Sequence, residues 1–471
     1  MTTRPELSRR LKLSYGFGEF GKALLFHAPN LVWLFFLTDV VGLAPAAAGL
    51  VALIPLLWDA VTDPLFGYIA DRTRTRYGQY RPYMIAGAPV AAGLFVLFFT
   101  DPAILGLPAF WTTLFFAILF RTSLTIIDVP HNSLMAKAVK DSRERATLAA
   151  VKMMFSSAAL IVIALATRPI LAGDGAGEEA RLFQLFAGVG AVLCVVLVWQ
   201  NAAAFRKIDA PGKAGSDPIG LGEAVGTLKA NRYLQMIAVC AILAMLLLPN
   251  FAKMVLYYAK YNLGREEAGG IALFAFTLAT FLAIPGWGLL ARRIDKARAL
   301  QFAHGLVALA LVTFYALPMN GFGALLGLSV VVGMGVGGAN MLTMALVPDV
   351  IEYGQARTGR RIEAGVFGCF TFSLKLGNGL GVGLLGLLLS AAGFVANTSQ
   401  TASTLGGLEA IMTLVPAAGS LFVVLILTRF DLGHEAHHRL VETIAGPTIL
   451  LDGERDGNVE PIGVDGQLGE A

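Results

Sequence analysis

Residues 45–82 read PAAAGLVALIPLLWDAVTDPLFGYIADRTRTRYGQYRP and hold the pattern that decides the fold. The segment 45–70 is long and apolar enough to cross a bilayer, which takes about 20 residues of helix. The loop behind it carries one aspartate and four arginines: Asp71, Arg72, Arg74, Arg76 and Arg81. A looser copy of this ending, Gly288 to Arg293, follows the apolar segment 267–291. The repeat predicts a membrane protein with two related halves.

Composition points to the same class of protein. Of the 471 residues, 56% are hydrophobic and 14% are charged, whereas soluble domains are about a quarter charged. This excludes an ordinary soluble protein. The breaks between apolar runs place the spans near 13–41, 45–70, 82–100, 109–136, 145–170, 182–205, 231–262, 267–291, 298–318, 321–347, 364–393 and 407–429. The sequence therefore predicts an all-α membrane protein with twelve transmembrane helices.

Charges between the spans predict the orientation. Basic residues gather in the second, fourth, eighth and tenth connections, which should therefore face the cytoplasm together with both termini of this multi-pass inner-membrane protein. The first span carries Glu19 and Lys22 and no signal-peptide cleavage site, so it should remain in the membrane. Composition divides the chain into an N-terminal six-helix half (1–205), a cytoplasmic linker (206–230), a C-terminal six-helix half (231–430) and a partly disordered cytoplasmic tail (431–471).

The cysteines and tail histidines, residue types that bind metals in other proteins, can be explained here without a metal. The three cysteines, Cys194, Cys240 and Cys369, lie far apart in apolar runs, as buried free thiols do. The tail histidines, His434, His437 and His438, either bind a metal or belong to a solvated tail. The net charge of +4 includes no single-signed block, so no nucleic-acid partner is expected.

Two acids stand in the second span, where a charge costs about 2.5–3.5 kcal/mol at the centre of the bilayer. Asp59 and Asp63 are four residues apart and share one helical face, and the Thr62 hydroxyl lies beside them. A bound cation would cancel their repulsion, because hard cations prefer carboxylate and hydroxyl oxygens. Protonation of one acid would do the same. The alternative is that both acids pair with arginines at a helix end.

The fourth span offers similar chemistry. Arg121, Thr125 and Asp128 are spaced to lie along one face of a helix. Lys375, among small residues of the eleventh span, is the preferred counter-ion for these acids. The remaining bases and the first-span histidine have alternatives: Lys152 and Lys253 either act in the site or snorkel to the interface, and His27 either relays protons or only hydrogen-bonds.

The sequence resembles the melibiose permease family, the glycoside-pentoside-hexuronide:cation symporters of the major facilitator superfamily. The matching segments are Leu13 to Gly18, Gly21-Lys22, Thr38 to Leu43, Trp58 to Pro64, Thr125 to Pro130, Asp141 to Arg145, Asp349 to Gly354 and Lys375. The resemblance covers about 11–430. It implies two pseudo-symmetric halves that rock about a central site.

The resemblance also implies roles for individual residues. The expected sodium or proton site is Asp59, Asp63 and Asp128, with Thr62 and Thr125 as auxiliary ligands. The expected substrate contacts or counter-ions are Lys375, Arg121, Lys22, Asn132, Lys152 and Trp58. The cytoplasmic loops should supply a gate of ion pairs from Asp71, Arg72, Arg81, Glu352, Arg361 and Glu363.

Sugar determinants differ from those of melibiose-transporting members of that family. Ala23 stands where they have an aspartate, Met153 where they have an arginine and Asn132 where they have a tryptophan. Arg121 stands where the melibiose-transporting members have a small residue. It either binds an anionic group such as a hexuronide carboxylate or neutralises Asp128.

The expected function is therefore symport of sodium or protons with a sugar or glycoside, of which a hexuronide-like acid is one candidate. The protein should act as a monomer and use no cofactor besides the coupling cation. A lysolipid or other amphiphile carrier is the main alternative. A membrane-embedded transferase is a weaker one, because the sequence has no metal-ligand cluster at a membrane surface and no soluble catalytic domain.

Overall fold

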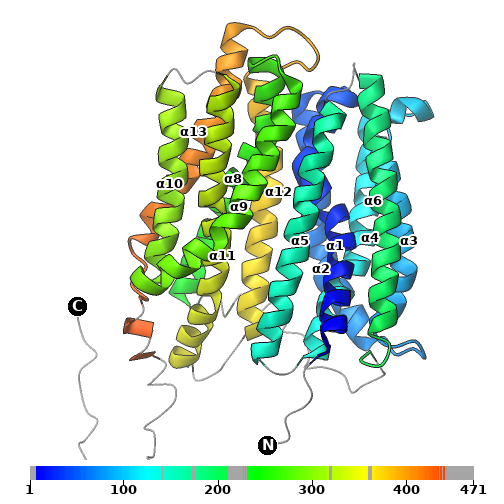
Figure 1. Ribbon diagram of the computed structural model, residues 1–471, viewed down its shortest axis with the longest axis vertical. Coiled ribbons are helices and arrows are strands. Elements are labelled where there is room, and N and C mark those ends of the chain that lie inside the picture. Colours follow the sequence, from blue (N-terminus) through cyan, green and yellow to red (C-terminus); the bar gives the residue numbers. More distant parts are fainter. Residues whose placement is uncertain are drawn as a thin grey trace, which may run out of the picture.

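A computed structural model describes residues 7–139, 142–171, 176–209, 226, 229, 231–317, 321–358, 363–433, 435–437 and 439–440. Within them lie twelve helical segments long and apolar enough to cross a membrane. The helices run side by side as one bundle (Figure 1). The all-α class and the twelve predicted spans are confirmed.

The first group of six long helices begins with α1. Its members and the two short elements between them are α1 (Arg9–Phe35), the π-helical η1 (Phe36–Val40), α2 (Pro45–Arg72), α3 (Arg81–Phe98), the 3₁₀ turn η2 (Pro102–Leu105), α4 (Ala109–Ala138), α5 (Ser142–Leu171) and α6 (Ala176–Ala204). Ser8 caps α1 by accepting the N–H of Leu11, and Pro45 starts α2, where a missing N–H costs nothing. Helix α1 packs on α5 and α6, α2 packs on α4, and α3 packs on α4 and α6.

The second group repeats this packing. It consists of α8 (Arg232–Tyr257), the π-helical η3 (Tyr258–Asn262), α9 (Glu266–Ile294), α10 (Lys296–Ala316), α11 (Phe322–Thr358), α12 (Glu363–Ala391) and α13 (Ala402–Leu427). The first helix, α8, packs on the fifth and sixth, α12 and α13; α9 packs on α11, and α10 packs on α11 and α13. Helices at equivalent positions in the two groups therefore have equivalent neighbours, as a pseudo-symmetric fold requires.

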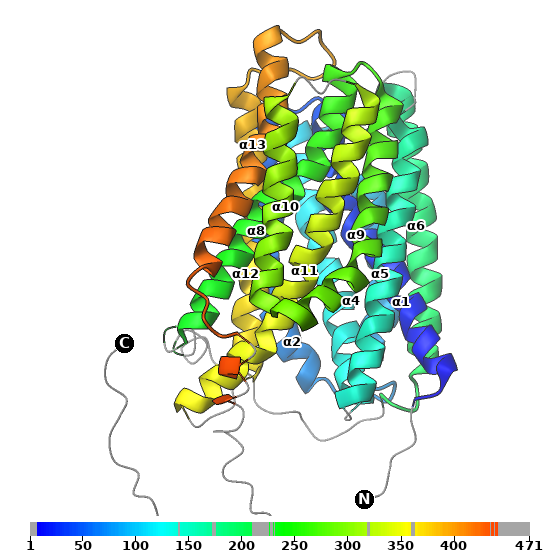
Figure 2. The same ribbon diagram turned by 60° about the vertical axis from the view of Figure 1, so that its left-hand side comes forward.

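The two groups meet along two equivalent helix pairs, α2 with α12 and α5 with α9. Helices α5 and α9 lie side by side in the middle of the bundle (Figures 1 and 2). Glycines bring α2 and α12 close: a Cβ built on Gly386 would lie 2.7 Å from the Cα of Gly49 and 2.5 Å from the carbonyl oxygen of Pro45. Small residues at such crossings let helix backbones pack in contact.

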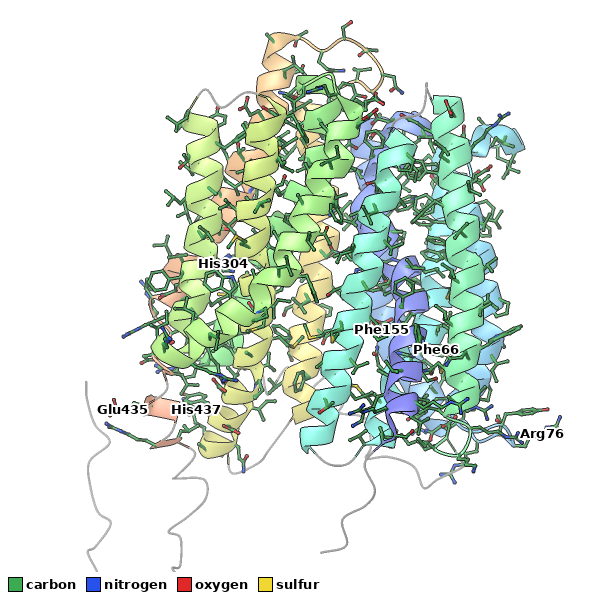
Figure 3. The ribbon with its side chains drawn as sticks, viewed as in Figure 1. Phe66, Arg76, Phe155, His304, Glu435 and His437 are labelled. Carbon is green, nitrogen blue, oxygen red and sulfur yellow. The ribbon has the colours of Figure 1, made fainter. Side chains whose placement is uncertain are left out.

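One span is longer than predicted. The apolar run ends near 347, but α11 continues to Thr358 and carries Glu352, which the sequence had placed in a loop. A helix does not stop where its apolar run stops, because polar side chains continue it into water. In the tail, His437 Nε2 lies 2.6 Å from Glu352 Oε2. Figure 3 shows His437 beside the lower end of α11. His434, His438 and residues 441–471 lie outside the described residues.

Candidate transport site

The two acids of α2 have basic partners on different helices. Nε of Arg121, on α4, lies 3.4 Å from Oδ2 of Asp59, and both side chains are buried. Asp63 forms an ion pair with Lys375 of α12 and accepts a hydrogen bond from Thr125 Oγ1 at 2.7 Å. Arg121 and Lys375 thus offset the repulsion that the four-residue spacing creates. Lys375 stands on the second six-helix group, so its pair with Asp63 joins the two groups.

Asp128 belongs to a separate cluster between α1 and α4. Lys22 Nζ lies 2.6 Å from Oδ1 of Asp128 and 2.8 Å from Oε2 of Glu19, one turn earlier on α1. His131 Nε2 lies 3.1 Å from the same Glu19 oxygen, and its ring stacks on Tyr15 with 4.4 Å between centroids. One lysine is therefore shared by two acids.

The sequence alone did not assign Glu19 or His131 to the site. The spacing of Glu19 and Lys22 by three residues was a usable signal, because such residues meet on one helical face. His131 carried no comparable signal, since its partner stands on α1, more than a hundred positions away.

Other expected contacts are more local. Lys152 Nζ donates to Asn132 Oδ1 at 2.6 Å, which joins α5 to α4. Trp58 Nε1 donates to Thr122 Oγ1 at 3.0 Å. The Thr62 hydroxyl donates to the carbonyl oxygen of Trp58, one turn earlier, at 3.1 Å, and keeps its oxygen lone pairs available.

The structure places the expected gate residues in different surroundings. Arg81 is buried and donates to the carbonyl oxygens of Tyr77 and Ala202, so it ties α3 to α6 within the first group. Glu352 pairs with His437 in the second group. Arg72 is exposed at the end of α2. Arg361 and the side chains of Asp71 and Glu363 lie outside the described residues.

A buried polar cluster, here called the latch, joins the two groups at the end where α1 and α8 stop. Lys260 Nζ of η3 lies 3.2 Å from Oδ1 of Asp39 in η1, and the Tyr261 hydroxyl donates to the same carboxylate. The hydroxyls of Thr38 and Tyr257 are 2.8 Å apart. Further contacts come from Glu179, Glu266 and Asn397. Asp39 lies near the end of the first predicted span, 13–41, and the structure buries it in this latch.

The whole length of the bundle matches one family of transporters. The family model described as "MFS/sugar transport protein" matches residues 14–434. Among solved structures, the nucleoside transporter NupG superposes with a TM-score of 0.62 at 12% identity, over 89% of this chain and 99% of that one. At that identity the likeness shows the fold alone.

Curated relatives cover nearly the full chain. The uncharacterized symporter YjmB of Bacillus subtilis is 29% identical over 94% of this chain and 96% of its own. The putative glycoside/cation symporter YagG of Escherichia coli is 26% identical over 90% and 92%. The glucuronide carrier protein homolog of Escherichia coli is 25% identical over 93% and 96%.

Proposed function

Because the chain belongs to the MFS/sugar transport family and is a symporter of its glycoside-pentoside-hexuronide:cation group, we propose that it couples entry of sodium ions or protons to uptake of a glycoside. Family membership excludes the membrane-enzyme alternative. The names of two relatives, a glycoside/cation symporter and a glucuronide carrier homolog, support a sugar-derived substrate. We also assign the protein to the inner membrane of the cell, because a further relative from Escherichia coli is named as an inner membrane symporter.

The ion pair between Asp63 and Lys375 is the observation that carries this proposal. The Lys375 ammonium group pairs with the Asp63 carboxylate, which a transported cation would bind instead. Thr125 Oγ1 lies 2.7 Å from the same carboxylate and would be a further oxygen ligand. A sodium ion replaces Lys375 at Asp63 and draws on Asp59 and the Thr62 oxygen. A proton replaces it by neutralising the carboxylate.

Coupling follows from where the two partners stand. Asp63 lies on α2 and Lys375 on α12, so cation binding removes a link between the two groups and releases an ammonium group that can donate hydrogen bonds to the substrate. If the cation favours substrate binding in this way, the substrate must favour cation binding by the same factor.

Asp128 is the third acid of the proposed site. Lys22 contacts Asp128 and Glu19 together, so it can pass entirely to Glu19, 2.8 Å away. That shift would free Asp128 for a cation without leaving a buried lysine unpaired, which would otherwise be costly.

The conformation supports access from the cytoplasm. The latch closes the end where α1 and α8 stop, while the side chains of Asp63 and Lys375 remain 22% and 27% exposed. The opposite end carries the start of α1 and the basic residues of the α2–α3 connection (Figure 1), and such residues favour the cytoplasmic side. We therefore assign both termini to the cytoplasm and the conformation to the inward-facing state.

Vesicles containing the purified protein test this function. A sodium or proton gradient should drive accumulation of p-nitrophenyl glycosides by the wild type, and Asp59→Asn or Asp63→Asn should abolish it. Asp101→Asn is the matched control, because within the described part of the chain the Asp101 carboxylate accepts the N–H of Ala103 and so caps the η2 turn, away from the site. Full accumulation by both site variants would contradict the cation site. Transport of lysolipids in place of glycosides would favour the amphiphile alternative.

A further inference from the structure

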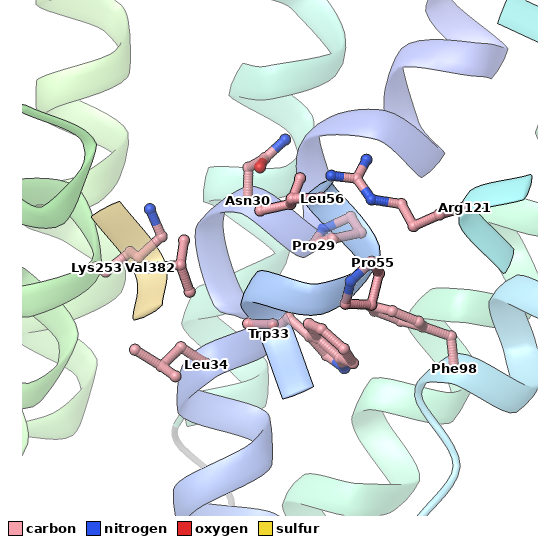
Figure 4. Close-up of a pocket in the computed structure, with 11 residues that line it drawn as sticks. Pro29, Asn30, Trp33, Leu34, Pro55, Leu56, Phe98, Arg121, Lys253 and Val382 are labelled. Atoms are coloured by element: carbon pink, nitrogen blue, oxygen red, sulfur yellow. The ribbon is translucent and has the colours of Figure 1, made fainter. Parts of the chain in front are cut away.

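A small cavity lies between the two six-helix groups, next to the Asp59–Arg121 pair. Its walls come from α1, α2, α4 and the η2-side end of α3 in one group and from α8 and α12 in the other, and the aromatic rings of Trp33 and Phe98 form one side (Figure 4). It holds about 20 Å³ of free space, which is room for little more than one water molecule.

Two buried cationic groups line this cavity. The Nη1 atom of Arg121 has no hydrogen-bond partner among the described residues, because Arg121 reaches Asp59 through Nε. Lys253, on α8, is only 3% exposed. Within the described part of the chain its ammonium group contacts the carbonyl oxygen of Pro249, one turn earlier on the same helix, at 3.4 Å. In Figure 4 the two residues lie on opposite sides, with the Asn30 amide between them.

Lys253 differs from three other lysines of the bundle interior. Lys22, Lys260 and Lys375 each lie beside a carboxylate, but none of the described carboxylates lies within ion-pair distance of Lys253. Its burial also rules out the snorkelling that the sequence allowed as an alternative. An unpaired charge in a membrane interior is expensive and by default indicates function.

We propose that this cavity is an anion subsite, in which the carboxylate of an acidic glycoside binds between Arg121 and Lys253. The inference rests on the proposed function and specifies its substrate class. Arg121 presents its free Nη1 to the carboxylate while Nε stays on Asp59, so one guanidinium contacts both the anion and the proposed cation site. Lys253 supplies the second charge from the opposite group.

The geometry explains why the cavity is small in this conformation. Its two sides belong to groups that the latch holds together, so separating α1 and α2 from α8 and α12 widens it and opens it toward the latch end. The subsite therefore receives the carboxylate in the outward-facing state.

Charge balance favours an anionic substrate over a neutral one. In this structure Asp59 and Asp63 each have a basic partner, whereas Asp128 shares Lys22 with Glu19. An incoming sodium ion offsets the acid that the shared lysine leaves uncompensated, so the charge of Lys253 becomes an excess positive charge. A substrate carboxylate offsets that excess in a medium where uncompensated charge is costly.

Matched acid and neutral ligands test the proposal without any mutation. The melting temperature of the purified wild type is measured in sodium buffer as each ligand is titrated in. Three pairs of ligands are compared: p-nitrophenyl β-glucuronide with p-nitrophenyl β-glucoside, glucuronate with glucose, and galacturonate with galactose. Members of each pair differ in a carboxylate against a hydroxymethyl group. At least tenfold tighter binding of the acid in one or more pairs is expected. Absence of an acid preference in every pair overturns the proposal.

Variants locate the preference at this cavity. Lys253→Met should weaken binding of the preferred acid at least tenfold and change binding of its neutral partner less than twofold, whereas Lys253→Arg should retain the preference. Lys296→Met is the control, because Lys296 pairs with Asp349 at the end of α10. Equal loss for acid and neutral ligands in Lys253→Met overturns the subsite. Gradient-driven uptake that prefers neutral glycosides overturns the subsite alone, while absence of coupled uptake of any glycoside counts against the proposed function.

Discussion

Lys375 of α12 and Asp63 of α2 form an ion pair across the boundary between the two six-helix groups. Both side chains are about a quarter exposed, whereas the Asp39 carboxylate that joins the groups at the latch is fully buried. The two links therefore differ in access: water and ions reach the first and are kept from the second. This difference suits the first to cation exchange and the second to holding one end shut.

Replacing Lys375 with Met should make the protein more dependent on sodium. Without the ammonium group, Asp63 keeps only its hydrogen bond from Thr125 and lacks a basic partner in sodium-free buffer. Because the pair is partly exposed, we expect a loss of about 2 kcal/mol, between the values for exposed and buried pairs. Melting temperatures in sodium chloride and in choline chloride check this, and the sodium-dependent increase should exceed that of the wild type.

The control for that experiment is Lys296→Met. Lys296 pairs with Asp349 at 2.6 Å, and its side chain is exposed to about the same extent as that of Lys375, but the pair lies away from the proposed site. Its melting temperature should fall equally in both salts. A Lys375→Met protein that responds to sodium no more than Lys296→Met does would contradict cation exchange at Asp63.

Replacing Lys260 with Met should open the latch. This removes the base beside the buried Asp39, and losing one partner of a buried pair costs about 3–5 kcal/mol. A change of about 1.4 kcal/mol already shifts a two-state population tenfold, so the ratio of the outward-open to the closed state should rise more than tenfold. Spin labels at Ala44 and Ala402, exposed on the two groups, should then show a longer distance in electron paramagnetic resonance.

Glu266→Gln is the matched control for the latch. Glu266 lies 3.4 Å from Lys260 but stands on the same six-helix group, so it does not bridge the groups. The label distance should remain that of the wild type. An unchanged distance in Lys260→Met as well would show that the latch does not hold this end closed.

The cluster around Lys22 should show charge compensation. Lys22→Met leaves the buried Glu19 and the partly exposed Asp128 without their shared base, and losing the buried Glu19–Lys22 pair should cost about 3–5 kcal/mol. Adding Glu19→Gln removes one of the two uncompensated charges and should recover part of that loss. Melting temperatures of both single variants and the double variant form a double-mutant cycle. Additive losses would indicate that Glu19 and Lys22 are not energetically coupled.

A side chain at Gly386 should prevent closure of the α2–α12 crossing. Gly386→Val places its Cβ within 2.7 Å of the Gly49 Cα, so the helices must move apart and transport should fall by at least tenfold. Gly368→Val, on the same helix, is the control, because its Cβ meets nothing within 4 Å in the described residues. Equal uptake by both variants in vesicles would exclude close packing at Gly386 as a requirement.

The spans were predictable because each depends on local composition. Runs such as 45–70 are apolar over the full thickness of a bilayer, and no other part of the chain is needed to recognise them. The ends were less predictable: α11 runs on to Thr358 although Pro348 and Gly354 lie in its last turns. Both residue types disfavour a helix interior, but tertiary packing overrides such local preferences.

Individual site residues were predictable, but their partners were not. Asp63, Thr125 and Lys375 stood out because polar groups are rare in apolar spans. Their meeting depends on how α2, α4 and α12 pack, which no local pattern specifies. The latch was missed for the same reason: Asp39 stands near the end of its span and looks like a loop residue until Lys260, over two hundred positions away, is placed beside it.

The π-helical segments at the ends of α1 and α8 make the latch depend on the winding of the backbone as well as on its side chains. Each segment, Phe36–Val40 and Tyr258–Asn262, fits an extra residue into a turn. If either segment kept all its residues but wound as ordinary α-helix, at about 100° per residue, its later residues would be rotated further around the helix axis, because a π-helix turns less per residue. Asp39 or Tyr261 would then face away from its partner although the sequence still contained every residue of the latch. The two groups thus keep this end shut partly through matching irregularities of the backbone, one in each.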